Sequence, residues 1–105
     1  MTNAQMQFEA ARLYHRIEVQ CDLSRTTFDR VRLHTSGTRE ANKIRLQWIK
    51  QDLIADANKI RVWATAKERT ELEKVTARSY YRNIAALLDR CNGLLVVCGY
   101  EQKEL

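Results

Sequence analysis

The sequence contains no proline and only three glycines among its 105 residues. Average usage would be about 5% proline and about 7% glycine, and these two residues interrupt helices most strongly. Their scarcity favours long helices joined by few turns. We therefore predict an all-α fold of three to four helices, at about residues 3–22, 25–34, 38–65 and 70–91, followed by an apolar tail at 94–100.

Long hydrophobic runs are also missing. None is longer than Leu94–Cys98, whereas a membrane span needs ~20 apolar residues. The N-terminus lacks the basic-then-apolar layout of a targeting segment, and the number of cysteines is odd, which argues against a disulfide framework. We expect a reduced, intracellular and cytoplasmic protein that does not contact membranes.

No motif for catalysis or metal binding is present. The glycines are isolated, so there is no phosphate-binding loop. Cys21, Cys91 and Cys98 lack paired zinc-site spacing, and His15 and His34 do not supply it. The carboxylates lie among basic neighbours, where solvated ion pairs are the usual arrangement. We therefore expect a protein that is not an enzyme, with no catalytic residues, metal or cofactor.

The composition indicates one helical domain over residues 1–105. Apolar residues make up 45% and charged residues 30% of the chain, as in ordinary soluble proteins. A core of this size is marginal alone, and pairing of two chains would enlarge it, so we predict a homodimeric helical bundle. The net charge of +5 favours anionic partners, nucleic acid above all.

The segment 38–64 is the element around which we expect the chain to be organised. At about 100° per residue it shows two apolar sectors on nearly opposite sides. The inner apolar sector comprises Leu46, Ile49, Leu53, Ile60 and Ala64, and the outer apolar sector comprises Ile44, Trp48, Ala55 and Val62. Between them lies a basic strip without a carboxylate, made of Arg39, Lys43, Lys50 and Arg61.

Of the segments before this helix, the first has a clear helical pattern and the second is ambiguous. Residues 3–22 carry one continuous apolar face. Residues 23–34 suit either a solvated connecting helix or a second basic surface that includes Arg30 and Arg32. Residues 35–37 are the clearest turn, and its shortness predicts an antiparallel hairpin between the helices on either side.

The C-terminal third contains conflicting signals. Thr65 with Glu68 and Thr70 with Glu73 both fit the capping-box pattern, which predicts a break between about 65 and 72; the alternative is a single helix running to Cys91. Asn92-Gly93 resembles a helix stop. The tail after it could dock as an extended segment or short helix, or pair with another chain, which makes Leu94 and Leu95 candidate interface residues.

The basic strip is the main functional hint. From Arg39 to Arg61 is about 33 Å of helix, close to one turn of a nucleic-acid duplex, so these cations could follow phosphates, with Gln47 and Asn58 donating beside them. Second-rank candidates are Arg30, Arg32, Arg78 and Arg82. No base-reading motif accompanies the strip. The alternative is an ordinary solvated face.

The outer apolar sector supports a competing hypothesis. Trp48 could stack on bases, but its apolar neighbours favour packing in a core or interface, and Trp63 adjoins the inner sector. A helical protein-interaction module, such as an inhibitor or adaptor from a virus or bacterium, would bind a protein partner through Ile44, Trp48, Ala55 and Val62.

The length, the hairpin around residues 35–37 and the basic strip together resemble the B2 proteins of insect nodaviruses. These are small all-helical suppressors of RNA silencing, in which two long antiparallel helices from each chain form a dimeric four-helix bundle. The resemblance covers roughly residues 3–64, and the third long helix differs from it. It implies a viral protein that binds double-stranded RNA in the host cytoplasm, a host–virus interaction.

Overall fold

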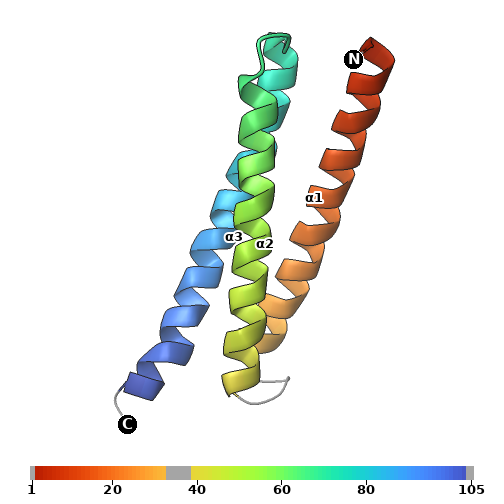
Figure 1. Ribbon diagram of the computed structural model, residues 1–105. Coiled ribbons are helices and arrows are strands. Elements are labelled where there is room, and N and C mark those ends of the chain that lie inside the picture. The colour runs from red at the N-terminus through yellow and green to blue at the C-terminus, as the bar shows by residue number, and fades with distance from the viewer. Residues whose placement is uncertain (1, 33–38, 104–105) are drawn as a thin grey trace.

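The computed structural model describes the backbone of residues 2–32 and 39–103, and within these ranges all side chains except those of residues 3, 32, 39 and 99–103. The fold is all-α, as predicted. It consists of three long helices, α1 (Asn3–Arg32), α2 (Arg39–Thr65) and α3 (Glu71–Lys103), and the described residues include no strand (Figure 1).

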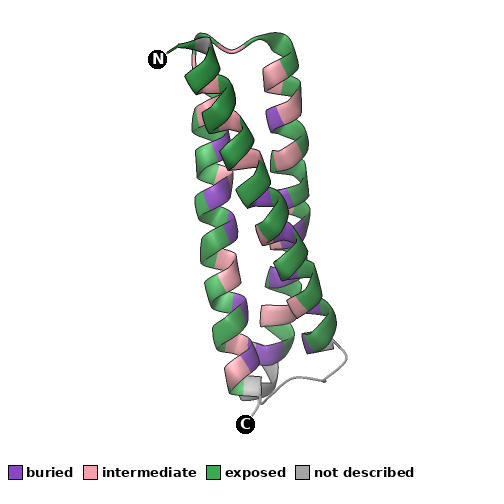
Figure 2. Cartoon of the chain, turned by 90° about the vertical axis from the view of Figure 1, so that its right-hand side faces the viewer, coloured by how far each residue is buried: buried purple, intermediate pink, exposed green. Residues whose placement is uncertain are grey.

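The three helices form an elongated bundle of 56 × 20 × 18 Å. Successive helices run in opposite directions, so α1 and α2 form the expected antiparallel hairpin (Figure 1). The α2–α3 pair makes the most extensive contact, and α1 lies obliquely across that pair (Figure 2). The molecule is therefore a tight two-helix layer with α1 on one side.

The core follows the apolar periodicity of each helix. Leu46, Leu53 and Ile60 of the inner apolar sector are completely buried, and Ile49 and Ala64 pack against them. Ile17 and Phe28 of α1 and Ile84 and Cys91 of α3 close the centre of the bundle, which is shown in purple in Figure 2. Each such aliphatic or aromatic side chain contributes about 1.5–3 kcal/mol by leaving water.

The predicted interruption between the first two segments is wrong, because α1 is continuous to Arg32. Polar residues in the middle of α1 are accommodated within the helix: the Ser24 hydroxyl donates to the Gln20 carbonyl at 2.7 Å. Phe28 and Val31 continue the buried face. Their burial outweighs the weak helix preference of this polar stretch. The turn at 35–37 and its candidate caps Ser36 and Thr38 lie outside the described residues.

The predicted break after α2 is confirmed, which excludes a single helix to Cys91. Helix α3 begins at Glu71 behind a capping box: the Thr70 hydroxyl accepts from the Glu73 N–H at 3.2 Å, and the Glu73 carboxylate accepts from the Thr70 N–H at 3.4 Å. Thr65 does not form the other predicted box and instead donates to the Arg61 carbonyl. An N-cap of this kind stabilises a helix by about 1 kcal/mol.

The predicted helix stop at Asn92-Gly93 is wrong, as is the separate tail, because α3 runs through to Lys103. Glycine inside a helix costs about 1 kcal/mol relative to alanine. Leu94 and Leu95, which pack on the core, and Cys98, which is buried, offset this cost. Gly93 itself lies on the outer surface of α3, where nothing would contact an added Cβ.

Candidate functional site

The basic strip lies along the edge of α2 that faces α3. Lys50 is close enough to the Cys91 thiol of α3 to influence it electrostatically, although burial dominates and raises the pKa of that thiol. Lys43 and Lys50 are half-buried, and Arg61 is exposed, as are Gln47 and Asn58. The side chain of Arg39 lies outside the described residues. The strip therefore opens onto the surface of the α2–α3 pair.

The arginines of α3 lie on the side of that helix that faces away from the core. Cys91 donates to the Leu46 carbonyl at 3.3 Å, which sets the antiparallel register and places Arg61 level with about residue 76 of α3. Tyr80 faces α1, since its hydroxyl donates to Glu18. Arg78 and Arg82 are each two residues from Tyr80, about 160–200° around the helix, and are therefore directed away from α1.

Both α2 and α3 therefore carry cations at the surface of the bundle. We call Lys50, Arg61, Arg78 and Arg82 the basic face. Within the part of the chain that the structure describes, none of the four forms an ion pair. Arg78 and Arg82 also line a shallow depression of about 260 Å³ with Ser79 and Asn83. Of the other second-rank candidates, Arg30 is exposed on α1, and the side chain of Arg32 is not described.

Cations on α1 are arranged differently. Arg12 lies 3.7 Å from Glu9, and Arg25 lies 3.0 Å from Asp22. Arg16 lies 3.7 Å from the buried Asp56 of α2. These ion pairs neutralise much of the charge on the α1 side. Helix α2 carries six lysines and arginines against three carboxylates, and therefore has the largest net positive charge of the three helices.

The outer apolar sector is uncovered. Trp48 is 66% exposed, Val62 is 67% exposed and Ile44 is 45% exposed, and Ala55 is exposed with them. This exposure excludes packing of Trp48 in the core of a single chain. Trp63 is half-buried, with the Arg69 guanidinium 3.2 Å above its ring.

Leu94 and Leu95 contribute to the core rather than to an open surface. The exposed apolar residues in that part of α3 are Val96 and Val97. The proposed interface role of the two leucines stays a prediction. Because both side chains are already partly buried within the chain, a second molecule could bury only the remaining part of their surface.

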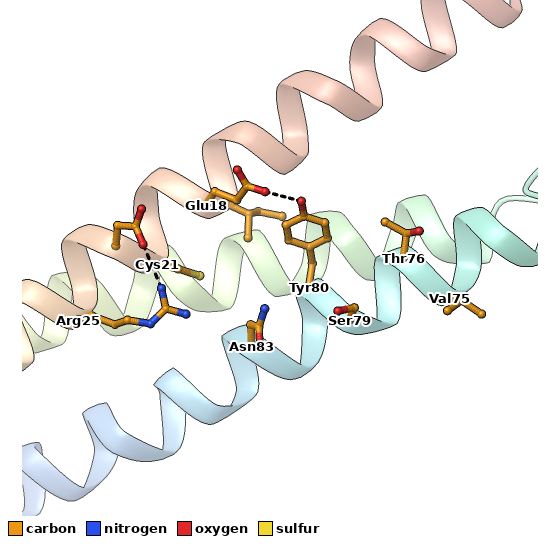
Figure 3. Close-up of a pocket in the computed structure, with 10 residues that line it drawn as sticks. Glu18, Cys21, Arg25, Val75, Thr76, Ser79, Tyr80 and Asn83 are labelled. Carbon is orange, nitrogen blue, oxygen red and sulfur yellow. Dashed lines mark hydrogen bonds and ion pairs between the residues drawn. The ribbon is translucent and has the colours of Figure 1, made fainter.

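A groove of about 610 Å³ separates α1 from α3 (Figure 3). Across it Tyr80 donates to Glu18 at 2.5 Å, and this hydrogen bond raises the pKa of Tyr80 to about 12. Burial raises the pKa of the Cys21 thiol in the same wall. Tyr80 also stacks on Tyr14, with ring centroids 4.5 Å apart. Both shifts favour the protonated forms of Tyr80 and Cys21 at neutral pH.

Sequence reasoning missed Asp56, which is only 3% exposed between α1 and α2. Its Oδ1 atom has no hydrogen-bond partner among the described residues and lies 3.7 Å from the Arg16 guanidinium. Burial raises the pKa of this carboxyl group, and Arg16 opposes that shift. A signal was present in the sequence, because Asp56 falls three residues after Leu53 and four before Ile60, on the buried side of α2.

Replacing Asp56 with asparagine should stabilise the protein by about 1 kcal/mol at pH 7. A carboxyl group whose pKa is higher in the folded than in the unfolded protein reduces stability above that folded pKa, where folding must keep the charge buried. The gain should therefore shrink as the pH falls to about 4. Thermal melts of both proteins from pH 4 to 8 measure it, with the exposed Asp89→Asn as control. A gain that does not change with pH would contradict this account.

None of the three described helices is long and apolar enough to cross a membrane. Comparison with protein-family models, curated proteins and solved structures finds no match to this chain.

Proposed function

We propose that the protein binds double-stranded RNA through the basic face, without catalysis. The observation that supports this is the presence of Lys50 and Arg61 on α2 and of Arg78 and Arg82 on α3, none of which forms an ion pair among the described residues. Unpaired cations on a rigid surface favour a polyanion, because binding releases the counterions condensed on its phosphates.

The shape of the surface favours a duplex over a single strand. Helix α2 is uninterrupted from Arg39 to Thr65, and its cations from Lys43 to Arg61 span about 27 Å, most of one duplex turn. Exposed Gln47 and Asn58 beside them can donate to phosphate or accept from a ribose 2′-hydroxyl. The three described helices include no element suited to reading base edges, so recognition by backbone and A-form shape is expected. Suppression of RNA silencing is the biological use that the B2 resemblance implies.

A second candidate function is supported by the exposure of Trp48. A helical interaction module would use the outer apolar sector to bind a protein, and an exposed tryptophan is a typical interface anchor. The two functions differ in which residue matters. Lys50→Ala should weaken RNA binding, whereas Trp48→Ala should weaken binding to a protein partner; the exposure of Trp48 means that this variant should still fold.

The test is a gel shift with an RNA duplex of about 25 base pairs, the matching DNA duplex and the single strand, at several salt concentrations. We expect binding to duplex RNA with a log–log salt slope of roughly −3 to −4 per protein chain, from four phosphate contacts at about 0.7–0.9 each. A slope near zero, or no shift of duplex RNA at low salt, would contradict the proposal. Equal binding to the DNA duplex would be consistent with the phosphate contacts but would exclude recognition of the A-form shape.

A further inference from the structure

Helix α2 carries two apolar seams with the same seven-residue spacing. Leu46, Leu53 and Ile60 form the buried seam, and Trp48, Ala55 and Val62 form the exposed one. Helices α1 and α3 cover the first seam (Figure 2), whereas the second is in water. A continuous exposed apolar seam on a small protein typically marks an interface, and its heptad spacing is that of a helix–helix contact.

We propose that the outer apolar sector of α2 binds the same sector of a second copy of this chain, with the two α2 helices antiparallel and the two-fold axis beside Ala55. This arrangement packs Trp48 on Val62 of the partner subunit, and Val62 on the partner's Trp48. Ala55 lies at the centre, where its small side chain lets the two helices approach closely. A surface that matches itself in this way is the requirement for a two-fold interface.

The charges beside the seam select the antiparallel orientation. Asp52 and Lys59 are exposed on the same edge of the outer apolar sector, and within the described residues neither forms an ion pair in its own chain. With the axis beside Ala55, Asp52 lies beside Lys59 of the partner subunit, and the contact occurs twice. A parallel two-fold pair would place this edge against the opposite edge of the partner helix, so that Asp52 and Lys59 would lose these opposite-charge contacts.

The size of the contact predicts a reversible dimer. From Ile44 to Val62 the seam is about 27 Å long. A single helix face of that length buries at most about 1,200 Å², which is the lower end of the range for stable protein–protein interfaces. We therefore expect dissociation in the micromolar range. The two-fold symmetry also places the basic strips of both α2 helices on the same side of the dimer. The dimer does not depend on the proposed RNA binding; only the use of this shared basic surface rests on it.

The test is the mass in solution, measured by sedimentation equilibrium from about 1 to 100 µM, a range in which contacts of this size dissociate. The wild-type chain should pass from 12.3 kDa to twice that mass. Trp48→Glu should raise the dissociation constant at least about 100-fold, because each dimer loses two anchors. Phe8→Glu is the matched control, since Phe8 is 62% exposed but lies on α1, and it should not change the mass. Circular dichroism checks that both variants stay helical.

A charge exchange tests the orientation. Asp52→Lys should weaken the dimer about tenfold, and adding Lys59→Asp should restore wild-type affinity to within about threefold. A wild-type chain that stays monomeric at every concentration overturns the proposal, as does a dimer that Trp48→Glu leaves intact. Failure of the double variant to recover overturns the antiparallel arrangement. None of these measurements involves RNA, so their outcome is separate from that of the gel shift.

Discussion

Replacing Arg61 and Arg82 together with glutamate should weaken binding to duplex RNA about 100-fold at low salt. The two residues come from different helices of the basic face. Each reversal removes one phosphate contact and adds repulsion from a phosphate. The salt slope should therefore become shallower by roughly 1.5 to 2 per chain. Fluorescence anisotropy of a labelled duplex across a salt series measures both quantities.

The matched control reverses two arginines elsewhere. Arg12 is exposed on α1 and Arg45 is exposed on α2 outside the basic strip, so the double variant Arg12→Glu with Arg45→Glu changes the net charge equally. We expect a loss of less than about fivefold, from the weaker general field alone. Equal losses in the two double variants would show that net charge, and not the basic face, governs binding.

Replacing Leu53 with alanine should destabilise the protein by about 3 kcal/mol. Leu53 is completely buried in the middle of α2, where α1 and α3 both pack, so the surrounding helices can collapse only partly into the cavity. For a domain of this size the midpoint of thermal unfolding should fall by about 15 °C. Urea unfolding followed by circular dichroism measures the same loss without assuming a heat capacity.

The control for this prediction is Leu23→Ala, the same substitution at a residue of α1 that is 60% exposed. It should cost less than about 0.5 kcal/mol. If Leu53→Ala costs no more than Leu23→Ala, the helices repack freely and the centre of the bundle is less closely packed than its burial indicates.

The helix boundaries show where sequence patterns succeed. Helix α2 was predicted at 38–65 and is observed at Arg39–Thr65, and the start of α3 was signalled by the Thr70–Glu73 cap. Both are local signals, a capped end and a regular apolar period. The boundaries that failed depended on distant contacts. The chain continues as a helix through Gly93 because α2 supplies a surface on which Leu94 and Leu95 pack.

The candidate site shows the same division. The basic strip and the line of arginines on α3 were both visible in the sequence, but as two unrelated features. How the two features lie relative to each other depends on the packing of α2 against α3, in which Cys91 donates to the Leu46 carbonyl. The buried Asp56 was overlooked because its burial arises from packing against α1 and not from its own residue type.

The sequence by itself determined the helical class, the position of the central helix and its two apolar sectors, because helix periodicity is a property of neighbouring residues. Only the tertiary structure decided which sector is covered. Helices α1 and α3 bury Leu46, Leu53 and Ile60, while Trp48 and Val62 face water. Two apolar faces of similar composition gain similar free energy from burial, so the choice between them lies in how the three helices fit together.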